Sequence, residues 1–420
     1  MTNLYHDTAE RAEVGAPLGG ERSVEVIVVG GGFTGLSAAL HLAESGTAVA
    51  LLEAHVPGWG ASGRNGGQVN PGLKVDPDLV VQRFGADLGE RMNALSGGAP
   101  AFVFNLIQRL GLDCEARRNG TLRAAVGARQ AARLRATAAQ LQGRGVAVEL
   151  LAGSALEQAT GTQRYTLAMF DPRGGDLHPL RYARGLAKAA RAAGAQLYEN
   201  SRALRLEKQG RGWRVSTPGG SICAPRVVLA TNGYTDGLWP KLQTTLVPVF
   251  SSIAASAPLT DMAARRILPG RSVLYEIGAV TCYYRVDIRQ RLLFGGRGPM
   301  REVSDASSLE HLLGYAEQLW PGVGSLTWTH AWSGQLAMTT DHYPHVHEPE
   351  PGITICLGYN GRGVAMSTVM GALLAARLAN PHGRFDMPIT DMQSIAFHAF
   401  WRTGVRAAIL RGRLLDWLGI

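Results

Sequence analysis

The chain has 420 residues, of which 46% are hydrophobic and 18% charged, and its formal net charge is +9. This composition excludes a disordered polymer, and the length suffices for two domains with sizeable cores. The four cysteines are widely spaced and form no C-x-x-C pair, which argues against structural zinc and fits a reducing cytosol.

The positive charge does not gather into a nucleic-acid-binding motif. The arginines are scattered, without a basic block interleaved with aromatic residues, so we expect no nucleic-acid partner. Residues 1–22 are polar, unlike a signal peptide, and no window is apolar enough for a membrane-spanning helix. We expect a cytoplasmic protein, at most peripheral to the inner face of a membrane.

The most informative stretch opens with a β-branched run, residues 24–29, that predicts a buried parallel strand. A G-x-G-x-x-G turn follows directly, with Gly30, Gly32 and Gly35 at its fixed positions. A helix is expected over residues 36–44 and a second strand over 48–52, which ends on Glu53.

Each part of this dinucleotide fingerprint has a physical task. Gly30 allows the tight turn, Gly32 lets the backbone approach a pyrophosphate, and Gly35 lets helix and strand pack closely. The pyrophosphate would lie at the helix N-terminus, and Glu53 would accept hydrogen bonds from ribose hydroxyls. The alternative, a glycine-rich loop in an ordinary α/β protein, requires strand, glycines, helix and acid to coincide by accident.

A glycine-rich loop over residues 57–68 follows, too irregular for a helix or strand. A cofactor lying along the first helix would pass this loop beyond its pyrophosphate. Small residues permit close approach, while Ser62, Arg64 and Asn65 supply donors for a phosphate or for ring carbonyls.

The pattern changes over residues 77–171, which contain no second nucleotide fingerprint and read as an insertion that forms part of a substrate domain. Helices are expected there over 87–96, 101–110 and 129–142, with a strand over 120–126. α/β character then returns, with a helix over 180–193 and strands over 196–198, 203–206 and 227–230. Asp176 and His178, just before that helix, are either functional or fill an N-cap or loop role.

Residues 241–338 read mostly as strands, with one helix over 307–319. The expected strands cover 244–257, 273–277, 281–286, 291–295 and 326–338. Tyr283-Tyr284-Arg285 and Gly295-Gly296-Arg297 mark this as the substrate-facing sheet, although aromatic residues that alternate along a strand are as often core.

Three histidines, His342, His345 and His347, invite a metal site. Prolines interrupt the segment, and no nearby cysteine or carboxylate pair completes a ligand set, so we expect no metal.

A second glycine-rich turn lies near the far end of the chain. A predicted strand over 353–357 runs into residues 358–364, and a helix is expected over 365–378. If both turns grip one molecule, that molecule is long, which favours FAD over NAD. The late helix N-terminus would stabilise the negative charge that develops on a reduced flavin.

The tail, residues 392–420, interleaves aromatic residues with arginines. It could lie on an anionic membrane or on a partner. Because the leucines of 405–418 do not fall on one clean helical face, docking on the protein's own core is the alternative.

With these motifs, the chain resembles the FAD-dependent amine and amino-acid oxidoreductases of the D-amino-acid-oxidase superfamily over nearly its whole length. Residues 60–68, together with Trp332-Ser333-Gly334 and Thr340, Asp341 and Pro344, look most similar to the gamma-glutamylputrescine oxidoreductase and bacterial L-pipecolate oxidase groups. The resemblance implies an α/β fold: a discontinuous Rossmann-like FAD-binding domain (24–76, 173–236 and 341–380), a mixed-sheet α+β substrate domain (77–172 and 237–340), and a tail (381–420).

The resemblance also implies roles for individual residues. The cofactor would be held by Gly30, Gly32, Phe33, Thr34, Gly35, Glu53, Ala54, Ser62, Arg64, Asn65, Gly66, Gly67, Gln68, Leu204, Thr231, Gly334, Asn360, Gly361, Gly363 and Val364. The substrate residues are chosen from their position alone and not from the resemblance: Arg285 and Arg297 would anchor a carboxylate, and Tyr283, Tyr284 and Trp332 would form the walls.

Some relatives attach FAD covalently, but residues 334–338 hold no cysteine and the Gly66-Gly67 position offers no histidine, so we predict non-covalent FAD. Sarcosine-oxidase-like members place a lysine above the flavin to activate oxygen. Of the four lysines here, only Lys74 lies beside a cofactor motif. Either Lys74 serves that role, or a respiratory acceptor replaces oxygen.

The implied reaction removes a hydride from a carbon that bears a neutral amine and delivers it to flavin N5, which leaves an imine that hydrolyses. The implied substrate is an L-pipecolate-like cyclic imino acid or gamma-glutamylputrescine. A tRNA-modifying flavoenzyme, a nicotinamide dehydrogenase and a non-catalytic nucleotide-binding module are the alternatives.

Overall fold

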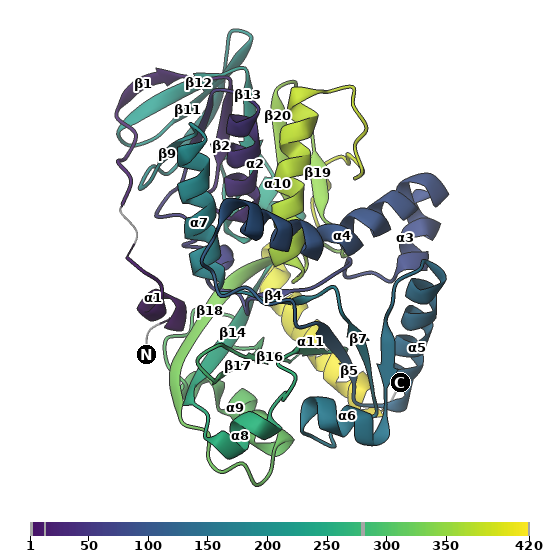
Figure 1. The fold of residues 1–420 in the computed structure, drawn as a ribbon. Helices are drawn as coiled ribbons and strands as arrows, with labels where there is room; N and C mark the ends of the chain where they lie inside the picture. Colours follow the sequence, from purple (N-terminus) through teal and green to yellow (C-terminus); the bar gives the residue numbers. More distant parts are fainter. Residues whose placement is uncertain (1–2, 12–13, 279–281, 419–420) are drawn as a thin grey trace.

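The computed structural model describes residues 3–11, 14–278 and 282–418. Figure 1 shows two lobes, one around a six-stranded sheet and the other around an eight-stranded sheet. This arrangement confirms the predicted mixed α/β class.

The six-stranded sheet has the order β19-β20-β13-β2-β3-β9 and draws its strands from three separate stretches of the chain. All neighbouring strands are parallel except β19, which pairs antiparallel at one edge. The strands are β2 (Val26–Val29), β3 (Val49–Leu52), β9 (Gln196–Tyr198), β13 (Arg226–Leu229), β19 (His345–His347) and β20 (Ile353–Leu357). The central strands are short runs of aliphatic residues because both faces of a parallel sheet are covered.

Alternate residues of β2 face different layers. Val26 and Val28 pack with the helices, whereas Ile27 and Val29 pack with a smaller four-stranded sheet. The helices are α2 (Phe33–Glu44), α4 (Ala86–Leu110), α7 (Pro179–Ala192) and α10 (Gly363–Ala379). The smaller sheet contains β1 (Gly20–Ser23), β10 (Arg205–Gln209), β11 (Gly212–Ser216) and β12 (Gly220–Ala224). The strand expected over 203–206 is therefore displaced to β10.

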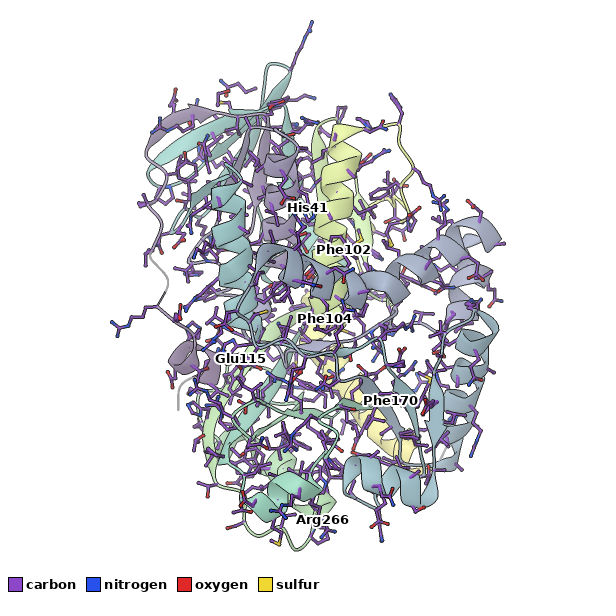
Figure 2. The ribbon with its side chains drawn as sticks, viewed as in Figure 1. His41, Phe102, Phe104, Glu115, Phe170 and Arg266 are labelled. Atoms are coloured by element: carbon purple, nitrogen blue, oxygen red, sulfur yellow. The ribbon has the colours of Figure 1, made fainter. Side chains whose placement is uncertain are left out.

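Helix α4 is continuous, so the two helices expected over 87–96 and 101–110 are one. Pro100 lies inside it and cannot donate to the carbonyl one turn back. That carbonyl, of Ser96, instead accepts a hydrogen bond from the Gly72 backbone N–H at 2.9 Å, so the proline leaves no unpaired group there. The helix crosses α2, where the rings of His41 and Phe102 stack at 5.8 Å (Figure 2).

The eight-stranded sheet has the order β18-β14-β17-β16-β15-β5-β7-β6 and is antiparallel except between β15 and β5. Its strands are β5 (Thr121–Ala125), β6 (Glu149–Leu151), β7 (Leu167–Asp171), β14 (Val247–Pro258), β15 (Val273–Glu276), β16 (Tyr283–Val286), β17 (Arg291–Arg297) and β18 (Trp328–Met338). The expected strand over 281–286 begins at Thr281, which lies outside the described residues. Helices in this lobe are α5 (Ala128–Gly143), α6 (Gly153–Thr160), α8 (Asp261–Arg266) and α9 (Glu310–Leu319), the last preceded by η4 (Ser307–Leu309).

Short elements connect the lobes. The small sheet of β4 (Gln68–Val69) and β8 (Gly175–Asp176) lies between them, and α1 (Leu4–Thr8) packs nearby (Figure 1). The remaining elements are η1 (Ala61–Gly63), α3 (Pro77–Phe84), η2 (Asn232–Tyr234), η3 (Leu242–Thr245), η5 (His398–Phe400) and α11 (Trp401–Leu418).

Candidate functional site

A cavity of about 480 Å³ opens at the carboxyl ends of the parallel strands and extends to the eight-stranded sheet. Ligands bind in this crevice in open α/β sheets. The predicted site residues that line it are Gly30, Gly32, Phe33, Thr34, Glu53, Ala54, Ser62, Arg64, Asn65, Gly66, Gln68, Lys74, Thr231, Arg297, Gly334, Asn360, Gly361, Gly363 and Val364.

The glycines of the early turn, residues 30–35, leave little or no room for a Cβ atom. Gly30 has φ +110°, and a Cβ on Gly35 would lie 2.0 Å from the Gly30 carbonyl oxygen. A Cβ on Gly32 would lie 3.0 Å from Ser62 Oγ at the cavity wall. Gly35 itself does not line the cavity, because its part is to let helix and turn pack.

The N-terminus of α2 lines the cavity, and the first N–H groups of the helix have no partner within the helix. Gly32 provides no side-chain cap, and the Phe33 N–H donates to Ser62 Oγ at 3.0 Å. Backbone donors and the positive end of the helix dipole together suit a phosphate group.

Glu53 follows β3 and is held by backbone. Its two carboxylate oxygens accept from the N–H groups of Gly31 at 2.7 Å and His55 at 2.9 Å. Burial raises the pKa of this carboxyl group, while the backbone donors oppose the shift. A fixed acceptor in this position suits ribose hydroxyls.

The late turn, residues 358–363, uses left-handed backbone three times. Gly358 has φ +84°, Asn360 φ +54° and Gly361 φ +83°. The Asn360 side chain secures the turn, since Oδ1 accepts from the Thr339 N–H at 2.9 Å and Nδ2 donates to the Gly358 carbonyl at 2.5 Å. The first turn of α10 therefore faces the cavity without a side-chain cap.

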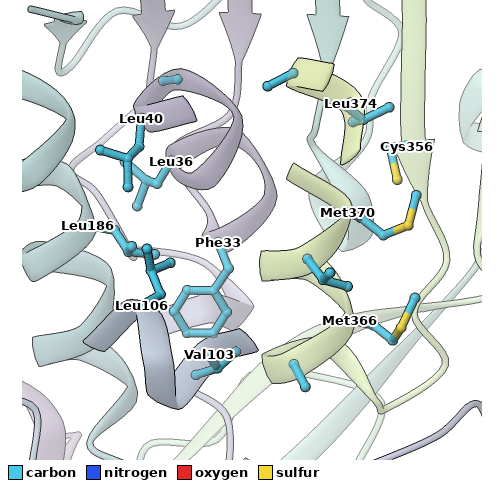
Figure 3. Packing of buried hydrophobic residues seen from close by; sticks show 14 of the residues in the cluster. Phe33, Leu36, Leu40, Val103, Leu106, Leu186, Cys356, Met366, Met370 and Leu374 are labelled. Carbon is cyan, nitrogen blue, oxygen red and sulfur yellow. The ribbon is translucent and has the colours of Figure 1, made fainter. Parts of the chain in front are cut away.

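The two turns are held side by side because α2 and α10 pack closely (Figure 3). A Cβ on Gly371 would lie 2.5 Å from the Thr34 carbonyl oxygen, so only glycine permits this approach. Two hydrogen bonds add to this packing. Thr34 Oγ1 of α2 lies 2.6 Å from Tyr359 OH of the late turn, and Ser37 Oγ of α2 donates to the Thr368 carbonyl of α10 at 2.7 Å. One ligand can therefore contact both turns.

The loop between the turns is arranged differently from the expectation. Asn65 Nδ2 donates to the carbonyls of Ala61 and Ser62, and its Oδ1 accepts from the Gly67 N–H. The expectation that Asn65 offers free donors to a ligand is therefore wrong. Its amide holds the shape of the loop.

At the far end of the cavity the wall is made of side chains. The Tyr283 ring lies against Gly66 and Gly295, and its hydroxyl is 2.8 Å from Ser251 Oγ. Arg362 Nη2 donates to Tyr275 OH at 2.5 Å, and its guanidinium carbon lies 4.5 Å from the Tyr275 ring centre.

Three cations gather at this end. Buried Nη1 atoms of Arg297 and Arg362 have no hydrogen-bond partner within the described residues. Lys74 lines the cavity, and no hydrogen bond or ion pair reaches it from the described part of the chain. Burial, reinforced by Arg362 and Arg123, lowers the pKa of Lys74 to about 8.

Three predicted substrate residues do not line the cavity. Tyr284 points to the opposite face of β16 from Tyr283, into the core of the lobe around the eight-stranded sheet, because side chains alternate along a strand. Arg285 Nη1 instead pairs with Asp176 at 2.9 Å, and Trp332 Nε1 donates to the Arg64 carbonyl at 2.8 Å. The expectation that Tyr284, Arg285 and Trp332 contact the substrate directly is therefore wrong.

Two cofactor predictions also fall beside the cavity. Leu204 is 53% exposed, and its neighbour Ala203 lines the cavity instead. Gly67 has φ +72°, and a Cβ there would meet the Leu177 carbonyl and the Arg285 guanidinium, so it allows packing behind the wall.

The sequence reasoning missed several lining residues. Asn232 Oδ1 accepts from the Gly358 N–H at 2.9 Å and ties the end of β13 to the late turn. Asn70, Tyr275 and Arg362 also line the cavity. The position of Arg362 inside the late glycine turn could have identified it as a lining residue. Asn70 and Tyr275 lie in no recognisable sequence motif, so nothing in the sequence indicates their position.

The structure places the histidines of 342–347 and His178, which precedes α7. His345 Nε2 lies 3.0 Å from Asp341, and the described residues contain no cluster of ligands for a metal. His178 is the N-cap of α7, since its side chain accepts from the Arg181 N–H.

Comparisons with known proteins identify the family of this chain. The model for the FAD dependent oxidoreductase family, DAO, matches residues 25–377. "Probable oxidoreductase OrdL" of Rhizobium meliloti (strain 1021) is 32% identical over 373 residues, 88% of this chain and 86% of the relative. Gamma-glutamylputrescine oxidoreductase of Escherichia coli (strain K12) is 32% identical over 365 residues, 86% of this chain and 85% of the relative.

A solved structure extends the comparison to the fold. Glycine oxidase from Geobacillus kaustophilus superposes with a TM-score of 0.72 at 25% identity and covers 86% of this chain and 96% of its own. Across the described residues, none of the helices is both long and apolar enough to cross a membrane. The chain belongs to the DAO family of FAD-dependent oxidoreductases.

Proposed function

We propose that this enzyme oxidises a C–N bond in an amine or amino acid that also carries a carboxylate. When bound, FAD supplies the two-electron acceptor for this chemistry. Gamma-glutamylputrescine and an L-pipecolate-like imino acid both have the required pair of groups, and the first agrees with the relative of that name.

The observation that carries the proposal is the uneven charge of the cavity. The described acidic side chains that line it are Glu53, at the end of β3, and Asp236, which pairs with Arg202 at 2.8 Å. Lys74, Arg297 and Arg362 line the other end. Guanidinium groups are preferred partners of carboxylates because they bind them with two parallel hydrogen bonds.

The side chains at this end have separate tasks in the proposal. Arg297 and Arg362 bind the carboxylate through donors that lack protein partners. The Tyr283 ring forms the apolar wall that orients the carbon chain, and Ser251 fixes its hydroxyl. Binding the substrate in one orientation accounts for much of the rate gain that a protein adds to its cofactor.

The residues of both turns fit FAD, and we propose that they hold it without a covalent bond. The backbone N–H groups of α2 would bind the pyrophosphate, Glu53 the ribose, and the late turn the flavin's pyrimidine edge. None of the described cysteines lines the cavity. Acid precipitation should leave the flavin in the supernatant, and a yellow pellet would contradict this.

We propose that the electrons pass to oxygen or to a respiratory acceptor, with Lys74 as the residue placed to activate oxygen.

Peripheral membrane contact through the tail, residues 392–420, also stays a proposal. Phe397 and Phe400 are 84% and 68% exposed, as an interfacial segment requires. The side chains of Arg413 and Trp417 lie outside the described part.

The test is anaerobic titration of the FAD-loaded protein with pairs of compounds that differ in the carboxylate. Gamma-glutamylputrescine is compared with putrescine, and pipecolate with piperidine, while flavin absorbance is followed. We expect the carboxylated member of one pair to bleach the flavin at much lower concentration. Equal bleaching within both pairs would contradict the carboxylate site, and bleaching by none of the four would contradict the substrate class.

A further inference from the structure

Two of the three predicted substrate residues that do not line the cavity share another property: Trp332 and Arg285 both donate to the backbone of the loop that lines it. Trp332 Nε1 donates to the carbonyl of Arg64, and Arg285 Nε donates to the carbonyl of Gly66 at 2.7 Å. The two bonds hold either side of Asn65. They come from behind, on the side away from the cavity.

The Arg285 side chain is buried and links the loop to several other groups by hydrogen bonds. Beyond Gly66, it donates to Asp176 at 2.9 Å and to the Leu177 carbonyl at 3.3 Å. Asp176 also pairs with Arg117 at 2.5 Å, so the carboxylate is shared between two arginines. A buried cation held by this many partners fixes the position of the loop that it contacts.

Behind both donors lies one residue from the other end of the chain, Tyr5 of α1. Its ring packs edge-on against Trp332 at 5.1 Å between centres, and its hydroxyl lies 3.4 Å from Arg285 Nη2. Only 1% of Tyr5 is exposed, and with Leu4 it joins a core cluster that includes Trp332 and Leu180.

Helix α1 is itself firmly attached. Asn3 caps it by accepting from the Tyr5 N–H, and Arg181 Nη2 donates to the Thr8 carbonyl at 2.9 Å. His178 accepts the Arg181 N–H at Nδ1, and burial followed by Arg285 lowers its pKa to about 3. The neutral ring therefore carries its proton on Nε2 and donates it to Thr8 Oγ1 at 3.0 Å.

We propose that Tyr5 is a positioning residue for the FAD-binding loop: packed behind Trp332 and Arg285, it keeps both in place to hold the carbonyls of Arg64 and Gly66. The N-terminal helix is thus part of the cofactor site although it never lines the cavity. The inference concerns cofactor affinity and does not depend on which substrate is oxidised.

The test compares Tyr5→Ala with Tyr165→Ala, because Tyr165 is also a buried tyrosine, 6% exposed, whose hydroxyl is bonded. Tyr165 lies in the core of the lobe around the eight-stranded sheet and does not line the cavity. The readouts are the melting temperature of the apoprotein and the dissociation constant of FAD, measured by quenching of flavin fluorescence. We expect both variants to melt lower, but only Tyr5→Ala to weaken FAD binding, by about tenfold to a hundredfold, the scale of losses from displaced supporting groups.

A second pair covers the case in which an alanine variant does not fold. Tyr5→Phe keeps the ring against Trp332 and removes only the hydroxyl, so we expect FAD binding to weaken slightly and less than in Tyr5→Ala; Tyr165→Phe should leave it unchanged. If Tyr5→Ala lowers the melting temperature but binds FAD as the wild type does, α1 is only a stabilising segment and the proposal is wrong. If only Tyr5→Phe folds, FAD binding equal to that of Tyr165→Phe would overturn it.

Discussion

The proposed cofactor end of the cavity is built mainly from backbone, whereas the proposed substrate end is built from side chains. At the first end, glycine is required at positions such as Gly35 because no Cβ atom fits there, and the backbone N–H groups at helix N-termini are the hydrogen-bond donors. At the second end, Lys74, Arg297 and Tyr283 come from separate elements. Backbone sites depend on local motifs, while side-chain sites depend on which way each strand residue points.

The largest expected effect comes from filling the backbone end. A Cβ in Gly35→Ala would lie 2.0 Å from the Gly30 carbonyl oxygen, so the turn must open and FAD binding should be lost. The matched control is Gly314→Ala, also in a helix, where no atom lies within 4 Å of the added Cβ. We expect the control to bind FAD normally and to gain about 0.5–1 kcal/mol in stability. Full FAD occupancy in Gly35→Ala would break the comparison.

This contrast also explains what the sequence predicts well. The strand, glycine turn and helix from Val26 to Glu44 follow one another directly in the sequence, and few other structures produce the same sequence pattern. The same holds for the late turn. Continuous α4 was missed because Pro100 normally ends a helix, and its lost bond is compensated by Gly72, which is distant in sequence.

The substrate end could not be predicted to the same depth. Tyr284 follows Tyr283 directly, but only the placement of β16 in the sheet decides which of the two faces the cavity. Arg285 looked like a carboxylate anchor because its partner Asp176 is more than a hundred residues away. The domain boundaries at 76, 172, 236 and 340 stay predictions.

Substitutions of Arg297 and Arg285 should separate the effects of the two ends of the cavity. Arg297→Met should raise the KM for carboxylated substrates about 10- to 100-fold while FAD stays bound, since a hydrogen bond to a charged group contributes ~1.5–3 kcal/mol. Arg285→Met should instead weaken FAD binding, because the loop loses the donor to Gly66. Steady-state kinetics and flavin content distinguish the two. Parallel losses of FAD in both variants would contradict separate cofactor and substrate ends.

A smaller effect is expected from Lys74. With its pKa lowered to about 8, the side chain is a cation below that pH and loses its charge as the pH rises further. The KM for a carboxylated substrate should therefore rise a few-fold above about pH 8. In Lys74→Met this additional rise should be absent. The ratio of wild-type to variant KM across pH 7–9.5 is the measurement. A ratio independent of pH would contradict a contribution of the Lys74 charge to carboxylate binding, separate from its proposed part in oxygen activation.

The same lysine affects stability in the opposite direction. Because its folded-state pKa lies below the unfolded value, its charging opposes folding at pH values below about 8, and this penalty fades as the pH rises to the unfolded pKa. The Lys74→Met apoprotein should thus melt higher than wild type at pH 7, with a smaller difference at pH 10. Equal melting temperatures at pH 7 would show that the ammonium group is well solvated.

The most direct measurement asks whether the late turn binds the same FAD as the early one. Gly361 and Gly46 have φ of +83° and +82°, and at both no atom lies within 4 Å of an added Cβ, but only Gly361 lines the cavity. Gly361→Val and Gly46→Val thus carry matched backbone strain. FAD titration of the two apoproteins should show binding lost in Gly361→Val and retained in Gly46→Val. Equal affinity in both variants would contradict a single cofactor held between two distant turns.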